Sequence, residues 1–233
     1  MQYAPEAFPF YLALWILTGV VITLIEIGLL HYVFESMGVS PRYMLLLLVL
    51  CLLGSYINIP VAQLPPERMR AGQIVDFFGI EYVVPIIVNH PGTVIAVNLG
   101  GAVVPFVLSL YLVFRHALFI SCLPAIAIVT YAVHRMAHAV PGVGIAVPIF
   151  IPPMIAAATA VVISPRRAGP LAYVAGSLGT LIGADLLNLG RVRGLGAPVA
   201  SIGGAGKFDG IFVTGLAAVL LAGLFGPRKR RRR

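Results

Sequence analysis

Seven apolar segments, each about as long as a membrane-spanning helix, dominate this sequence. They cover residues 10–33, 43–63, 94–114, 117–138, 143–164, 170–189 and 209–226. A transmembrane helix needs roughly 20 consecutive apolar residues. Only 10% of the 233 residues are charged, which is too few to coat the surface of a water-soluble domain. We therefore expect an all-α membrane protein, a single polytopic domain over residues 1–233 with about seven transmembrane helices.

The stretch of residues 64–98, between the second and third segments, has a different pattern. Residues 81–88 and 93–98 are rich in β-branched residues, and the sequence Asn-His-Pro-Gly at residues 89–92 is typical of a turn. Pro85 would restrict its strand to the edge of a sheet. The sequence thus predicts a small β-hairpin at the membrane surface or over a cavity, because unpaired strand edges cannot face lipid.

The distribution of basic residues predicts the orientation. Six of the sixteen Lys and Arg residues form the C-terminal run 228–233, directly after the last apolar segment. With seven helices and this tail in the cytoplasm, ten basic residues are cytoplasmic (Arg42, Arg115, Arg166, Arg167 and the tail) and six are outside (Arg68, Arg70, Arg135, Arg191, Arg193 and Lys207). The excess favours an N-out, C-in topology, although without the tail the count is four against six. The net charge of +8 therefore predicts contact with membrane lipids, with the tail on anionic headgroups, and no binding of nucleic acid.

Two short sequences each occur twice in similar form, and the two copies are four predicted helices apart. Residues 53–58 resemble 182–188, and residues 98–102 resemble 201–205. The pattern allows two parallel repeats, residues 10–114 and 143–226, joined by a linker helix at 117–138, as in some small transporters. The alternative, chance recurrence in a chain with 25 glycines, stays open.

Polar residues that the predicted topology brings towards the extracytoplasmic face form the candidate site. We expect Asp185, Asn188, Asp209, Asn58 and Asn98 to line a site for a solute or an ion. Burying an ionisable residue within a membrane span costs a few kcal/mol or more, so such residues are candidates for function. Asp185 and Asn188 are three residues apart and are expected to share a helix face.

Other interpretations of these residues remain. Asp209 followed by Gly210 is typical of a helix N-cap, and Asp185 can pair with a basic residue such as Arg191. His134 and His138 have the i, i+4 spacing of a metal pair, but no Glu or Cys stands nearby to complete a site. The two cysteines lie inside apolar runs. We therefore predict no metal and no cofactor.

Several phrases together resemble a known family. They lie at residues 54–60, 97–102, 141–145, 183–190 and 201–212. They resemble the domain-of-unknown-function 1614 family, multi-pass membrane proteins of bacteria and archaea, from about residue 45 to residue 223. The resemblance implies a prokaryotic cytoplasmic membrane and supplies no activity or catalytic residues.

Three functions are compatible with these features. The first is a small-solute or proton-coupled transporter. The second is an intramembrane aspartyl protease in which Asp185 and Asp209 share a proton and activate water, although the Gly-x-Gly-Asp pattern of such proteases is absent. The third is a non-catalytic accessory subunit. Whether the chain is an enzyme stays open, and so does its oligomeric state, a homo-oligomer included.

Overall fold

A computed structural model of the protein describes residues 7–77, 80–90, 92–140, 144–192, 197–204 and 210–225. Most of this described part is helical. Its α-helices are α1 (Ala7–Met37), α2 (Met44–Gly54), α3 (Val104–His116), α4 (Phe119–Met136), α5 (Ile151–Ile163), α6 (Ala168–Thr180) and α7 (Gly210–Phe225). Short 3-10 helices precede α2 and α6, at η1 (Pro41–Tyr43) and η3 (Pro165–Arg167).

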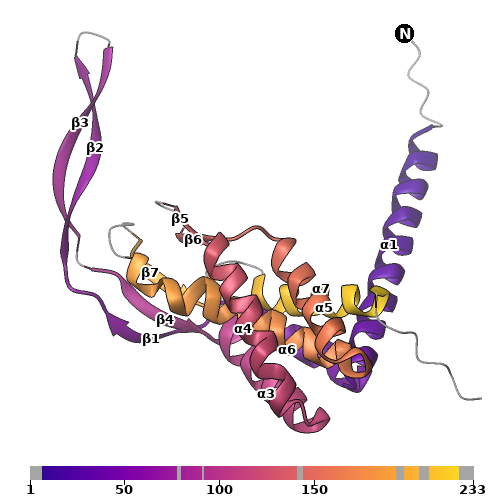
Figure 1. The fold of residues 1–233 in the computed structure, drawn as a ribbon. Helices are drawn as coiled ribbons and strands as arrows, with labels where there is room; N and C mark the ends of the chain where they lie inside the picture. The colour runs from indigo at the N-terminus through magenta and orange to yellow at the C-terminus, as the bar shows by residue number, and fades with distance from the viewer. Residues whose placement is uncertain are drawn as a thin grey trace, which may run out of the picture.

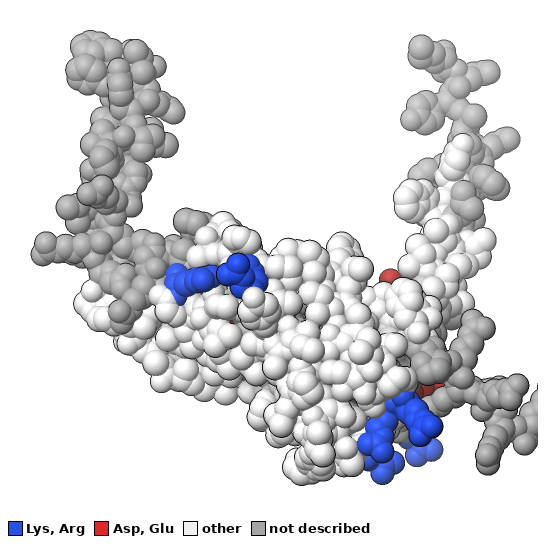
Figure 2. Space-filling model, in the orientation of Figure 1, with Lys and Arg blue, Asp and Glu red and all other residues white. Residues whose placement is uncertain are grey.

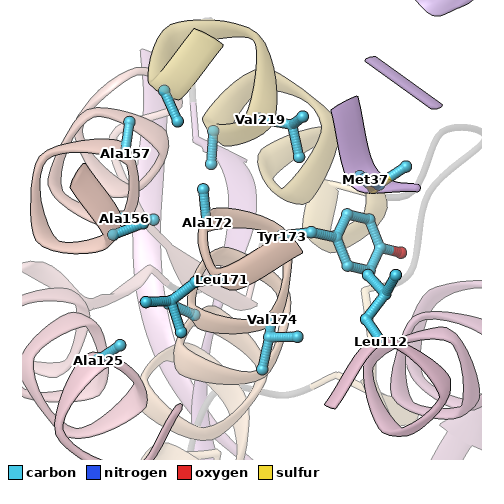
Figure 3. Close-up of a cluster of buried hydrophobic side chains, with 14 of the residues drawn as sticks. Met37, Leu112, Ala125, Ala156, Ala157, Leu171, Ala172, Tyr173, Val174 and Val219 are labelled. Carbon is cyan, nitrogen blue, oxygen red and sulfur yellow. The ribbon is translucent and has the colours of Figure 1, made fainter. Parts of the chain in front are cut away.

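Helix α6 is the central element of the bundle. Tyr173, with Leu171, Ala172 and Val174 beside it, is fully buried. Figure 3 shows these side chains in the middle of the core, surrounded by side chains of the other helices, among them Ala125, Ala156, Val219, Met37 and Leu112. The opposite extreme is α1, whose N-terminal half stands apart from the bundle and exposes its apolar side chains (Figure 1).

Small residues allow α4 and α6 to approach each other closely. A Cβ atom at Gly179 would lie 2.6 Å from Val129 Cβ, and one at Gly183 would lie 2.6 Å from the carbonyl oxygen of Thr130. Gly176 packs in the same way against Ala218 and Ala156. These three glycines therefore form a helix-packing seam, and such seams of small residues let membrane helices gain contact area.

Helix ends gather at two opposite ends of the bundle. At one end, the Nε2 atom of His116 lies 2.8 Å from the carbonyl oxygen of Met37, and Arg167 donates a hydrogen bond to the carbonyl oxygen of His116 at 2.7 Å. These contacts join the C-terminal ends of α1 and α3 to the start of α6. At the other end, Arg191 donates to the carbonyl oxygen of Ala137 at 3.4 Å. Figure 2 shows basic side chains gathered in two separate places.

Three short strands from distant parts of the chain form the main sheet, at the end of the bundle that holds Arg191. The strands are β1 (Asn58–Gln63), β4 (Val94–Asn98) and β7 (Val199–Ile202), in the order β1-β4-β7. Strand β4 lies antiparallel to β1 and parallel to β7. Two further pairs are β2 (Glu67–Phe77) with β3 (Ile80–His90), which extend away from the bundle in Figure 1, and β5 (His138–Val140) with β6 (Gly144–Ala146).

This region does contain a hairpin, but the predicted pairing of residues 81–88 with residues 93–98 is wrong. Residues 81–88 belong to β3, which pairs antiparallel with β2, from Phe77 opposite Ile80 to Glu67 opposite His90. Residues 94–98 form β4, which pairs with β1 and β7 instead. The turn signal at residues 89–92 marks the departure of the chain from the projecting hairpin into the sheet.

Some predicted helices are also shorter than the apolar segments. Four helices of the described chain are long and apolar enough to cross a membrane: Trp15–Met37, Leu99–His116, Phe119–Met136 and Pro165–Arg191. Helices α2, α5 and α7 are apolar but shorter. The segment 43–63 ends in strand β1, and α5 starts only at Ile151 because Pro152 and Pro153 fit the first turn of a helix and not its interior.

Candidate functional site

The amide side chain of Asn98 ties together the end of α2, strand β1 and the start of the next helix. Its Nδ2 atom donates to the carbonyl oxygen of Ser55 at 2.8 Å and to Asn58 Oδ1 at 3.1 Å. Its Oδ1 atom accepts a hydrogen bond from the backbone N–H of Gly101 at 2.7 Å. Asn98 is 1% exposed, so its amide group lies in the interior. Both the nitrogen and the oxygen of the side-chain amide therefore make hydrogen bonds that stabilise the junction.

The helix that Asn98 caps begins with a π-helical turn, η2 (Leu99–Val103), which continues into α3. Its small residues let α2 pack directly on it: a Cβ atom at Gly100 would lie 2.5 Å from the backbone nitrogen of Ser55 and would also collide with the carbonyl oxygen of Cys51. A π-helical turn inside a helix is rare and is often found at functional sites.

Asn58 extends this network to the third strand. Its Oδ1 atom accepts a hydrogen bond from Ser201 Oγ at 2.6 Å as well as the one from Asn98. Asn58 is exposed, whereas Asn98 directly opposite it in the sheet is buried. The network therefore runs from the interior to the surface of the molecule across all three strands.

A second π-helical turn follows α6. It is η4 (Leu181–Asp185), and a 3-10 helix, η5 (Leu186–Arg191), follows it. The change of helix type leaves backbone carbonyls without their usual helical donors. Asn188 compensates, because its Nδ2 atom donates to the carbonyl oxygens of Gly183 at 2.8 Å and Ala184 at 2.9 Å. Its Oδ1 atom is buried and has no hydrogen-bond partner among the described residues.

Asp185 ends this second π-helical turn and reaches the sheet. Its Oδ2 atom accepts a hydrogen bond from the backbone N–H of Gly203 at 2.7 Å. Gly203 has φ +98°, and a Cβ atom there would lie 2.6 Å from the backbone nitrogen of Ala102. Only glycine fits this position without strain. The half-buried carboxylate of Asp185 is thus held beside the first π-helical turn, at the end of β7.

Most of the predicted site residues fall at this junction, although not as one cluster. Asn58 and Asn98 are in contact, Asp185 joins the same region through the β7 segment, and Asn188 lies three residues beyond Asp185 but turns its amide back to its own helix. Asp209 lies outside the described residues, so the separation of the two aspartates is untested.

The i, i+4 spacing of His134 and His138 does not place them on one helix. His134 lies in α4, but this helix ends at Met136, and His138 belongs to strand β5, where it pairs with Ala146. The two rings therefore do not share a helix face. In the part of the chain that the structure describes, no group of three or more His, Cys, Asp or Glu residues is placed to hold a metal ion.

Sequence reasoning missed Ser201, although it donates the shortest hydrogen bond of the network. A signal for it existed. Ser201 occupies the place in the phrase 201–205 that Asn98 occupies in the phrase 98–102. Both residues lie at or near the end of a strand, and β4 and β7 are parallel neighbours. The comparison of the two phrases, residue by residue, would have pointed to Ser201.

These features define a class: a mostly helical protein with several helices compatible with a membrane, and with a polar junction where two helices change to π-helical geometry. The family model described as protein of unknown function (DUF1614) matches residues 52–221, and the chain belongs to this family. The match covers the whole junction. No curated protein and no solved structure matches the chain.

Proposed function

We propose that this protein is a small-solute or proton-coupled transporter and that Asp185 is the ionisable group of its binding site. The single observation that carries the proposal is the half-buried carboxylate of Asp185, held by Gly203 at a break between two helical geometries. Discontinuous helices with exposed backbone groups are the usual construction of binding sites in secondary transporters.

The lengths of the helices support a site within the membrane. Helix α2 has 11 residues, a rise of about 16 Å, against about 30 Å for the hydrocarbon core. Irregular backbone at membrane depth is tolerated only where it is buried in protein or lines a cavity. A second span that ends in Ser55 and Asn58 would therefore bring the polar junction below the membrane surface.

The proposal includes seven spans in a prokaryotic cytoplasmic membrane, with the N-terminus outside and the C-terminus inside. It is supported by the arginines at the end of the bundle where α1 and α3 finish and α6 begins: Arg42, Arg115, Arg166 and Arg167. Gly223, near the end of α7, packs against Tyr32 of α1, so the described part of α7 finishes near the C-terminal half of α1. An excess of Arg and Lys favours the cytoplasmic side, where the tail would contact anionic lipid headgroups.

The purified protein in liposomes tests the proposal. A pH-sensitive dye inside the liposomes reports proton entry under an imposed membrane potential, with and without a panel of small solutes outside. We expect flux above that of empty liposomes, and we expect Asp185→Asn to abolish it. The matched control is Glu26→Gln, which removes an exposed carboxylate on α1 far along the chain from the junction.

Two results would overturn this function. One is flux in Asp185→Asn equal to that of the original protein. The other is the absence of protein-dependent flux with every solute of the panel, although the protein is folded in the liposomes by circular dichroism.

A further inference from the structure

Two buried hydroxyl groups on the central helix lack the hydrogen bond to a backbone carbonyl oxygen that such groups usually make. Serine and threonine side chains in helices commonly donate to the carbonyl oxygen four residues earlier. Thr23 and Thr214 do so, to Gly19 and Gly210. Ser177 Oγ and Thr180 Oγ1 have no hydrogen-bond partner in the described part of the chain. Since buried polar atoms in proteins are nearly always hydrogen-bonded, to protein or to water, these two require an explanation.

The changes of helix type bring these hydroxyls into line with Asp185. Ser177 and Thr180 are one turn apart on α6. The π-helical turn between Thr180 and Asp185 uses five residues, so it returns to nearly the same side of the helix. In the 3-10 helix that follows, side chains three residues apart eclipse each other, which places Asn188 over Asp185. In an uninterrupted α-helix, at about 100° per residue, these four residues would cover an arc of about 140°, so the changes of helix type narrow a row that already shares one face.

Contacts with the last part of the chain fix the direction of this polar row. Ser177 faces Gly215 of α7, where an added Cβ would collide with its hydroxyl. Asp185 faces Gly203, between β7 and α7. Ser177 therefore contacts α7 itself, and Asp185 contacts the chain just after β7.

The row continues towards the basic end of the bundle. Tyr173 lies one turn below Ser177 and also faces Gly215. In Figure 3 its hydroxyl oxygen lies close to Leu112 and Met37. The carbonyl oxygen of Met37 lies 2.8 Å from Nε2 of the half-buried His116, beside Arg167. Asp185 thus lies beyond one end of α6, the three hydroxyls lie along the helix, and His116 lies at the other end of the bundle, on the far side of Met37.

We propose that this row is a hydrated proton path along α6, with Asp185 at one mouth, the hydroxyls of Thr180, Ser177 and Tyr173 along it, and His116 at the other. The inference rests on the proposed function and adds that the proton is the transported or coupling ion. With water molecules between them, each hydroxyl accepts a hydrogen bond from one neighbouring water and donates one to the next, so it takes up one proton as it releases another. Polar groups that face a bundle interior commonly mark such routes.

Silver ions test whether the row is hydrated, independently of any transport. In a background with Cys51→Ala and Cys122→Ala, single cysteines are placed at Ser177, Thr180 and, as the control, Ala175. Ala175 lies on the same helix, is also fully buried and belongs to the apolar core. Ag⁺ is small and water-borne, and it replaces the proton of a thiol, which leaves as H⁺. The rate is read as protection from alkylation after denaturation, by mass spectrometry.

A hydrated path predicts that Ser177→Cys and Thr180→Cys react with Ag⁺ at least about tenfold faster than Ala175→Cys. It also predicts that Ser177→Ala with Thr180→Val lowers proton flux, whereas Thr214→Val does not, because the hydroxyl of Thr214 is bonded within its own helix. Equal Ag⁺ rates at all three positions would overturn the path. If Asp185→Asn still abolished flux in that case, the transporter proposal would stand without this route.

Discussion

The two π-helical turns of this protein are built from similar glycine- and alanine-rich sequences, but their hydrogen bonding differs. At η2, Asn98 uses both atoms of its amide, and Gly100 packs against the backbone of α2. At η4, Asn188 donates hydrogen bonds to two backbone carbonyls, but its own Oδ1 is buried without a partner among the described residues. The hydroxyl of Thr180, just before this turn, is also buried without a partner among the described residues. The first turn is closed by protein contacts, and the second leaves polar atoms facing the interior.

This difference separates what holds the fold from what is available for chemistry. A fully bonded amide such as that of Asn98 stabilises one geometry and has no capacity left for a ligand. Buried acceptors and hydroxyls without protein partners cost stability unless water or a ligand reaches them. Mutations at η2 should therefore act mainly on folding, and mutations at η4 mainly on function.

The largest effect is expected for Gly100→Ala at η2. The new methyl group would overlap backbone atoms of Cys51 and Ser55, which cannot move without separating α2 from the sheet. We expect a loss of about 3 kcal/mol or more in the free energy of unfolding, measured by titration with SDS in mixed micelles. The control is Gly190→Ala near η4, where nothing lies within 4 Å of the new atom. Similar losses in both variants would contradict the tight packing.

The strands at this junction show where sequence reasoning succeeds and fails. Helices α1, α4 and α7 begin and end within a few residues of their apolar segments, because length and hydrophobicity suffice to define a long helix. Residues 58–63 and 94–98 are equally apolar, and a short apolar run does not distinguish a strand from a helix. Their pairing depends on residues about 40 and 105 positions apart, which no local pattern encodes.

The site was predictable to a similar extent. Successive helices alternate in direction, and this alone was enough to place one group of residues at the same end of the bundle: Asn58, Asn98, Asp185 and Asn188. Which of them are bonded to each other depends on the two π-helical turns, and these arise from close backbone packing at glycines such as Gly100 and Gly183. Such packing is a tertiary property, so the different states of Asn98 and Asn188 were not visible in the sequence.

Asn98→Ala is expected to have the second largest effect. It leaves the N–H of Gly101 and the carbonyl oxygen of Ser55 without this partner in a buried region, at a cost of about 1–3 kcal/mol for such a group. We expect the free energy of unfolding to fall by about 3 kcal/mol. Asn98→Asp keeps only the acceptor to Gly101 and turns a buried carboxylate oxygen towards the carbonyl oxygen of Ser55 and Asn58 Oδ1, so it should not recover this loss. Full stability in Asn98→Ala would show that the network does not hold the junction.

Asp185→Asn should have a smaller effect on stability. The amide oxygen can still accept the hydrogen bond from Gly203. The free energy of unfolding should therefore fall only by the difference in strength between a hydrogen bond to a charged acceptor and one to a neutral acceptor, about 1 kcal/mol. Thermal unfolding in detergent measures it, and the proteoliposome flux described above provides the functional readout. A loss as large as that of Asn98→Ala would place Asp185 among the residues that hold the fold and would weaken the contrast between the two turns.

Asn188→Ala should have an effect as small as that of Asp185→Asn and provides the sharpest comparison with Asn98→Ala, since both remove a buried amide that lies beside a π-helical turn. It removes the donors to Gly183 and Ala184, but it also removes a buried oxygen that has no partner among the described residues. These contributions oppose each other, so the free energy of unfolding should fall by only about 1 kcal/mol. SDS titration of both variants under the same conditions gives the difference directly. Equal losses would mean that Asn188 Oδ1 is as fully bonded as the amide of Asn98, with water or a bound group as its partner in the folded protein.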